Sequence, residues 1–141
     1  MKAFSKILYI EDEQLQRDTL ERLYAMCQKC FDGVVKFVTA STWEAGLAIM
    51  RNGDVDVAVV DLTLPPMHKE ETLLEIERHW ETLPPIVVLT GNEDPKLRRQ
   101  SIEAGCDDFL LKMEVNRHPE VLCERVYIAY LRRNRHATKG A

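Results

Sequence analysis

Short apolar runs alternate with amphipathic stretches along the whole chain. The apolar runs are rich in valine, isoleucine and leucine, which is typical of strands that are buried on both faces. They predict strands at residues 7–10, 34–38, 57–60, 86–90 and 108–112. Between them, apolar residues recur every three or four positions, the spacing of one helix face. These stretches predict helices at about residues 15–33, 41–52, 70–80, 94–105 and 116–133.

This strict alternation of strand and helix predicts an α/β fold. Short connections and apolar strands indicate a parallel sheet with right-handed crossovers and helices on both faces. We expect a flavodoxin-like three-layer (βα)5 sandwich with five strands in the order 2-1-3-4-5. The predicted domain covers residues 5–133, and residues 134–141 are interpreted as a basic, flexible C-terminal tail or a truncated linker.

Local signals predict where some helices begin and which side chains they bury. Ser41 and Glu44 form a capping box with Ser41 as the N-cap. Asp94 followed by Pro95 is a helix-start signature. On the third helix, the side chains expected to point inward are Leu73, Ile76 and Trp80.

Composition and charge exclude several classes of protein. The 141 residues carry a formal charge of −4, which argues against direct binding of nucleic acid. No apolar run approaches the length of a membrane span, and no signal peptide precedes the first strand, so a cytoplasmic location is expected. Cys27 and Cys30 have the spacing of a redox motif but lie at the end of a helical pattern. All four cysteines are interpreted as reduced, mostly buried thiols.

Candidate chemistry gathers at the ends of the predicted strands. The residues concerned are Glu11, Asp12, Asp61, Thr90 and Lys112. Each one alone is more often structural, because acids cap helices and lysines are usually solvated. In a parallel sheet, however, the carboxyl ends of the strands share one edge, where ligands bind.

The residue types at this edge suit phosphoryl transfer. Neighbouring carboxylates repel one another, and Mg²⁺, which prefers oxygen ligands, relieves that repulsion. Asp61 could then attack a phosphoryl group as a nucleophile. Thr90 and Lys112 could neutralise the phosphoryl oxygens. No glycine-rich phosphate loop is present, which argues against a nucleotide site.

At this point the sequence resembles the response regulator receiver domains of two-component signalling. Four segments carry the resemblance, in order and at family-like spacing. They are ILYIEDE at residues 7–13, DLTLP at 61–65, VVLT at 87–90 and GCDDFLLK at 105–112. The ordered set spans nearly the whole chain, whereas each segment alone is a weak signal.

The resemblance implies a role for each matching residue. Asp61 would accept the phosphoryl group from a histidine kinase, a phosphotransfer protein or a small phosphodonor. Mg²⁺ would be held by Glu11, Asp12, Asp61 and the backbone carbonyl of Thr63. The conformational switch would run through Thr90, Phe109 and Lys112. Thr63 and Asn92 would tune autodephosphorylation. Such a domain is a signalling switch and not a turnover enzyme.

Four departures from the family pattern affect loop geometry more than chemistry. Glu11 stands where aspartate is commoner, and Gly91 stands where alanine is common. Residues 66–69 lack the usual glycine. Met113 follows Lys112 where the family usually has proline, so the loop after the fifth strand is expected to differ.

The last helix also indicates a partner. Four of its apolar residues form an inward stripe: Leu122, Val126, Ala129 and Tyr130. Four others lie outside that stripe: Val121, Tyr127, Ile128 and Leu131. Because the family signals through the fourth helix, fifth strand and fifth helix, we interpret them as a surface for an effector or a homodimer. Isolated exposed apolar residues are the plainer alternative.

Two alternatives to the phosphorylated switch are considered. A pseudo-receiver would have the same fold and bind partners without being phosphorylated. A Mg²⁺-dependent phosphatase would need a second acid near the nucleophile. Thr63, two residues after Asp61, is a poor acid, so the sequence argues against the phosphatase.

Overall fold

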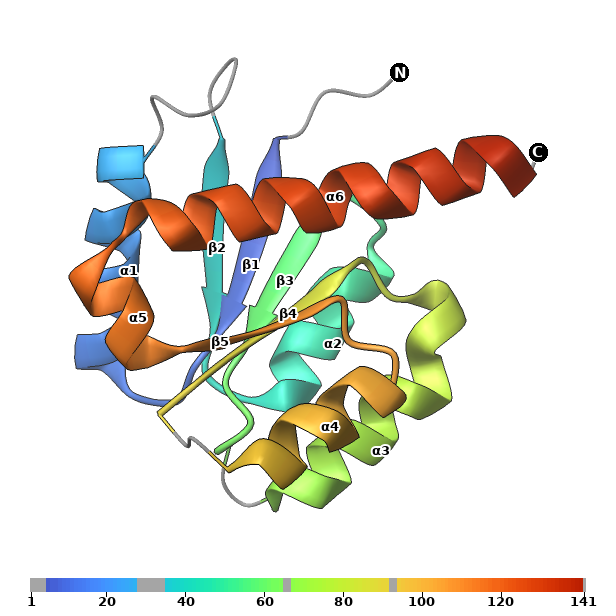
Figure 1. The fold of residues 1–141 in the computed structure, drawn as a ribbon, viewed down its shortest axis with the longest axis horizontal. Helices are drawn as coiled ribbons and strands as arrows, with labels where there is room; N and C mark the ends of the chain where they lie inside the picture. Colours follow the sequence, from blue (N-terminus) through green and yellow to red (C-terminus); the bar gives the residue numbers. More distant parts are fainter. Residues whose placement is uncertain (1–4, 28–34, 65–66, 92–93, 141) are drawn as a thin grey trace.

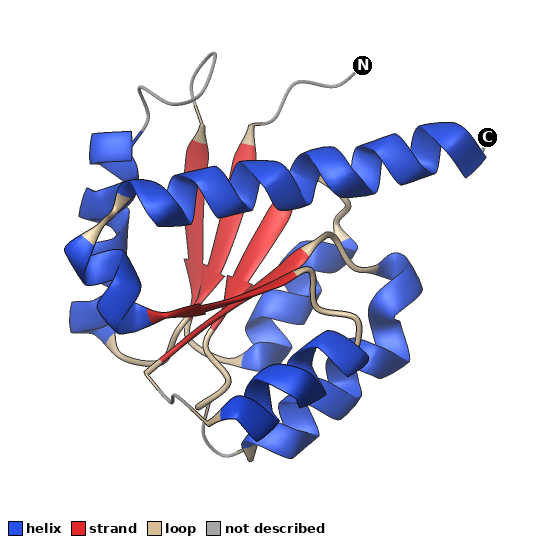
Figure 2. Cartoon of the chain, in the orientation of Figure 1, coloured by secondary structure: helices blue, strands red, loops and turns tan. Residues whose placement is uncertain are grey.

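A computed structural model describes residues 5–27, 35–64, 67–91 and 94–140. It consists of one parallel sheet between two layers of helices (Figures 1 and 2). The five strands are β1 Lys6–Ile10, β2 Lys36–Ala40, β3 Val57–Val60, β4 Ile86–Thr90 and β5 Asp108–Leu111. Their order is β2-β1-β3-β4-β5, which confirms the predicted topology.

The helices lie between the strands, as predicted. The first four are α1 Gln14–Cys27, α2 Trp43–Arg51, α3 Lys69–His79 and α4 Pro95–Glu103. A 3-10 turn, η2 Trp80–Thr82, extends α3. Two more helices, α5 Lys112–Arg117 and α6 Glu120–Gly140, follow β5. Within the described parts of the chain, no helix combines the length and apolar character that crossing a membrane requires.

Alternation along the strands divides the core in two. In a strand, successive side chains point to opposite faces of the sheet. Residues such as Tyr9 and Val59 therefore pack beneath α1, α5 and α6, on what we call the α1–α6 face. Residues such as Ile10, Val60 and Val88 pack against α2, α3 and α4, on the α2–α4 face. Every residue of β3 and β4 is buried, as their apolar sequences predict.

Two helix starts show how local signals compare with the structure. Asp94 is the N-cap of α4 and accepts a hydrogen bond from the backbone of Lys96, as predicted. For α2, the expected Ser41 capping box is wrong. Thr42 is the N-cap, and its hydroxyl accepts a bond of 3.1 Å from the backbone of Ala45.

The predicted inward position of Trp80 is also wrong. Leu73 and Ile76 are buried, but Trp80 begins η2 and is 40% exposed. Its indole N–H donates to the carbonyl of Gly105 at 2.9 Å, and the Arg133 guanidinium stacks over its ring. Trp80 thus joins η2 to the turn before β5 and to α6.

Strand β2 and the last predicted helix also differ from expectation. Strand β2 lies two residues later than predicted, because it pairs with β1 from Lys6–Lys36 through Ile10–Ala40. The single last helix expected at 116–133 is two helices. His118, before Pro119, has the extended φ of −137° that a residue preceding proline favours, and this breaks α5 from α6.

Helix α6 continues past the predicted domain boundary at residue 133. It runs to Gly140, so residues 134–140, expected to belong to a basic, flexible tail or a truncated linker, have helical backbone structure. The four residues predicted to form its inward stripe are buried: Leu122, Val126, Ala129 and Tyr130.

Two of the four cysteines lie in the buried core of the domain. Cys106 and Cys123 are free, buried thiols, as expected. Burial raises the pKa of Cys106 to about 12, so its thiol stays protonated at neutral pH. Cys30 lies outside the described residues.

Candidate functional site

Two acidic residues extend neighbouring strands at the carboxyl edge of the sheet. The backbone N–H of Glu11 donates to Ala40, and that of Asp61 donates to Ile10, both at 3.0 Å. These bonds continue the sheet ladder one residue beyond β1 and β3. Glu11 is 1% exposed and Asp61 4% exposed, so both carboxyl groups are buried. Their positions are therefore set by the sheet itself.

Strand alternation brings these groups to the same face. Tyr9 lies on the α1–α6 face, so Glu11, two residues later, follows it to that face. Asp61 lies two residues after Val59, and Lys112 lies two residues after Leu110. The same rule therefore places both on the α1–α6 face. The sequence thus predicts the convergence once the strand order is known.

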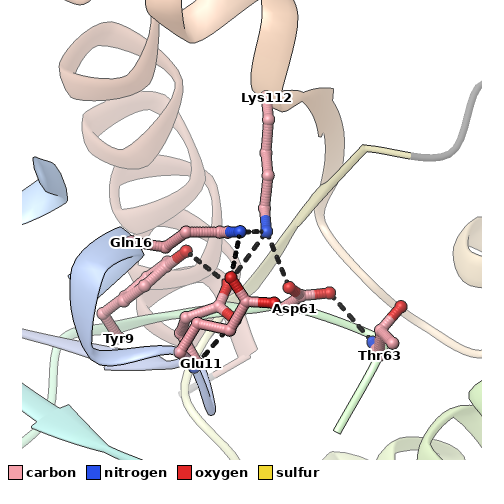
Figure 3. A network of polar contacts seen from close by, with 7 residues as sticks. Tyr9, Glu11, Gln16, Asp61, Thr63 and Lys112 are labelled. Carbon is pink, nitrogen blue, oxygen red and sulfur yellow. Dashed lines mark hydrogen bonds and ion pairs between the residues drawn. The ribbon is translucent and has the colours of Figure 1, made fainter.

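Lys112 connects the two carboxylates (Figure 3). Its Nζ donates to Asp61 Oδ2 at 2.8 Å and to Glu11 Oε2 at 2.9 Å, and it also donates to the Gln16 side-chain oxygen. An ammonium has three N–H donors, and these acceptors account for all of them. The other Asp61 oxygen accepts a bond of 2.9 Å from the backbone N–H of Thr63.

Burial and charge shift the titration of this group. Burial, followed by the nearby Asp61 carboxylate, raises the pKa of Glu11 to about 7, against the opposing effect of Lys112. Burial alone would lower the pKa of Lys112, but its bonds to Asp61 and Glu11 outweigh that effect and raise it. Lys112 therefore stays charged. Its single positive charge faces two carboxyl groups, those of Glu11 and Asp61.

The raised pKa of Glu11 predicts that metal-free stability falls as the pH rises from about 4 to about 7. In an unfolded chain, the pKa of a glutamate side chain is about 4.3. Because the folded pKa is higher, the stabilising contribution is complete below the unfolded pKa and is lost as pH rises through about 7. Thermal unfolding in a metal chelator should show this loss. Glu11→Gln, which cannot titrate, should show a clearly smaller decline, and an identical decline would contradict the assignment.

The other residues singled out in the sequence occupy several environments. Asp12 and the Thr63 side chain are exposed next to the buried pair. Thr90 is 1% exposed at the end of β4 and, by alternation, belongs to the α2–α4 face. Phe109 is buried on that same face. Asn92 lies outside the described residues.

The expected cluster of three carboxylates is not gathered in the structure. Among the residues described, no three acidic, histidine or cysteine side chains form a group that could hold a metal ion. Glu11 and Asp61 are brought together, with Lys112 between them. Asp12, the third acid expected in that cluster, is exposed.

Two contacting residues were missed in the sequence. The Tyr9 hydroxyl donates to Glu11 at 3.1 Å, and Gln16 contacts Lys112 from α1. Tyr9 could have been found, because residues two apart on a strand share a face. Gln16 could not, because its contact depends on how α1 packs over the sheet.

Lys112 also shows how the departure at Met113 is accommodated. Helix α5 begins at Lys112 itself, with Leu111 as its N-cap residue. Met113 is exposed in the first turn of that helix. The connection after β5 therefore has no loop residue between Leu111 and the first residue of α5.

Comparison with known proteins identifies the family. The family model of the response regulator receiver domain matches residues 7–126. The chain therefore belongs to the response regulator receiver domain family, and it is a signalling domain of the two-component type.

Individual relatives agree with that assignment. The C4-dicarboxylate transport transcriptional regulatory protein DctR of Rhodobacter capsulatus is 29% identical over 107 residues, which cover 73% of this chain and 50% of DctR. The aerobic respiration control sensor protein ArcB of Escherichia coli is 35% identical over 75 residues, 52% of this chain and 10% of ArcB. The chain thus spans half or less of these relatives. The FixJ-N crystal structure has a TM-score of 0.73 at 25% identity and covers 92% of this chain and 95% of its own.

Proposed function

We propose that this domain is a phosphorylation-activated switch in which Asp61 accepts a phosphoryl group. The observation that carries the proposal is the buried Asp61 carboxylate at the end of β3, held 2.8 Å from the Lys112 ammonium. The donor would be a histidine kinase or a phosphotransfer protein. Resemblance to response regulators and to a sensor protein supports such a partner.

The chemistry follows from the charges of these residues. An Asp61 carboxylate oxygen forms a bond to phosphorus as the bond from phosphorus to the donor's histidine nitrogen breaks. Lys112 neutralises negative charge on the phosphoryl oxygens. The hydroxyl of Thr90 would close on the same oxygens. Thr63 and Asn92 would set the rate at which water later removes the phosphoryl group.

Mg²⁺ fits the donor set of this edge. Glu11, Asp12, Asp61 and the Thr63 carbonyl offer oxygen ligands only, which Mg²⁺ prefers. Burial, followed by the neighbouring Asp61 carboxylate, raises the pKa of Glu11, and a divalent cation beside these carboxylates would stabilise their charged forms. When bound, the cation supplies charge neutralisation at the phosphoryl group. Receiver domains generally use Mg²⁺, which supports the same assignment.

The switch would pass through the α2–α4 face. Thr90 and Phe109 both lie on that face, on neighbouring strands β4 and β5. Phe109 borders a hollow of about 350 Å³ together with Pro95, Arg98 and Arg125. A shift of Thr90 toward a phosphoryl group would change the packing around Phe109, and new contacts in one state would bias the equilibrium.

The output surface would include the outer side of α6. Tyr127 is 39% exposed and Leu131 is 40% exposed, one helical turn apart. We propose that they contact an effector or a second copy of the domain. A monomeric elution profile that a phosphoryl mimic leaves unchanged would contradict the homodimer.

Intact mass spectrometry tests the function directly. The protein is incubated with acetyl phosphate with and without Mg²⁺, beside Asp61→Asn. We expect one phosphoryl adduct that requires Mg²⁺ and is absent from the variant. Asp56→Asn is the matched control, because Asp56 is buried at the opposite end of β3 and should leave the adduct intact. Absence of both the adduct and Mg²⁺ binding would overturn the proposal and favour a pseudo-receiver adaptor.

A further inference from the structure

Tyr9 is a buried phenol whose hydroxyl lies inside the candidate site. The residue is 0% exposed in the middle of the sheet. Its ring stacks on Phe37 at 6.2 Å between centroids and packs in the apolar cluster beneath α1 and α6. A buried tyrosine hydroxyl needs a hydrogen-bond partner, and here the partner is Glu11 at 3.1 Å.

Glu11 is held by donors of different rigidity (Figure 3). Its Oε2 accepts from both Tyr9 and Lys112, whereas Oε1 accepts a longer bond of 3.3 Å from the backbone of Glu13. The Lys112 side chain is long, 24% exposed and shared with Asp61 and Gln16. Tyr9 is locked by its packing. Of these two side chains, Tyr9 is therefore the one that orients the Glu11 carboxylate.

Orientation matters more for glutamate than for aspartate. Glu11 has one more rotatable bond than the aspartate common at this position, so ordering it costs more conformational entropy. A rigid donor such as the Tyr9 hydroxyl orders the Glu11 side chain during folding, so this entropy is already lost before a ligand binds. With Oε2 tied to Tyr9, Oε1 carries the weaker bond and is the oxygen more easily given to a cation.

We propose that Tyr9 is a positioning residue that sets the affinity of the Glu11–Asp61 edge for a divalent cation. The proposal rests on the proposed function, because it assumes that Glu11 is a cation ligand. It adds a role for a residue of the sheet interior that never contacts the phosphoryl group. Partners behind metal ligands typically contribute between about 10-fold and 100-fold in metal affinity.

Calorimetric titration of the whole chain with MgCl₂ tests this role. Tyr9→Phe keeps the ring and removes only the hydroxyl, and we expect its Kd for Mg²⁺ to rise about tenfold. Tyr24→Phe is the matched control, because Tyr24 is 3% exposed in the same cluster and also packs on Phe37. Its Kd should equal that of the parent. Thermal unfolding of each variant in a chelator measures any effect on the fold.

Phosphorylation by acetyl phosphate provides a second measurement. In Tyr9→Phe the Mg²⁺ concentration for half-maximal adduct formation should rise in step with Kd, while the rate at saturating Mg²⁺ stays near that of the parent. An unchanged Kd beside a parent that binds Mg²⁺ normally would overturn the role of Tyr9 alone. Equal rises in Tyr9→Phe and Tyr24→Phe would also overturn it, since they would report a general packing effect. A parent that neither binds Mg²⁺ nor forms the adduct would overturn the proposed function itself.

Discussion

Replacing Lys112 with methionine is expected to slow formation of the phosphoryl adduct by about 100-fold or more. The substitution removes the only positive charge that contacts both Glu11 and Asp61 among the described residues, and it keeps the length of the side chain. Stabilisation of the phosphoryl oxygens by that charge is lost. Intact mass spectrometry at saturating Mg²⁺ and acetyl phosphate measures the rate.

The same variant should also lose stability. Removing one partner of a buried ion pair leaves its carboxylates unpaired, which typically costs about 3 kcal/mol. Lowering the pH toward 6 should restore part of the loss, because Glu11, whose pKa is already raised to about 7, then takes up a proton. Urea unfolding at both pH values checks this expectation.

Lys36→Met is the control for both measurements. Lys36 is exposed on β2, away from the acidic edge, so its loss should change neither rate nor stability appreciably. An adduct formed by Lys112→Met at the parent's rate would show that this ammonium does not take part in the transfer. Lys112→Arg, which keeps the charge, should retain more activity than Lys112→Met.

Gly105→Ala is expected to destabilise the domain by about 3 kcal/mol, through overpacking together with backbone strain. Gly105 has a φ of +102°, a value that residues other than glycine rarely adopt. A Cβ there would also lie 2.3 Å from Cδ1 of Trp80. The indole would have to move, which would break its bond to the Gly105 carbonyl and disturb its stacking with Arg133.

Gly53→Ala separates the two causes. Gly53 has a similar φ of +82°, but a Cβ there meets nothing within 4 Å. It should cost only the backbone strain, about 1 kcal/mol. Chemical denaturation of both variants gives the comparison. In a Trp80→Ala background the cost of Gly105→Ala should fall toward that of Gly53→Ala, and equal costs in both backgrounds would exclude the clash.

Most of the fold could be predicted because the information is local. The short apolar runs of β3 and β4, rich in β-branched residues, favour strands buried on both faces, and that is how both strands lie. Asp94 with Pro95 marked the start of α4. The errors in the position of β2 and of Trp80 occurred where distant contacts decide. Pairing with β1 shifted β2, and the turn at Gly105 with Arg133 on α6 placed Trp80 at the surface.

The candidate site divides in the same way. By itself, the sequence determined the candidate residues at the carboxyl ends of β1, β3 and β5, because the polar residue that follows each apolar run and the alternation of side chains are local properties. It therefore placed Glu11, Asp61 and Lys112 at one edge of a sheet of known order. Only the tertiary structure decided that Lys112 bridges the two carboxylates, that Gln16 reaches it from α1, and that burial raises the pKa of Glu11. These features depend on distances and solvent exclusion between segments far apart in the chain, which no local pattern encodes.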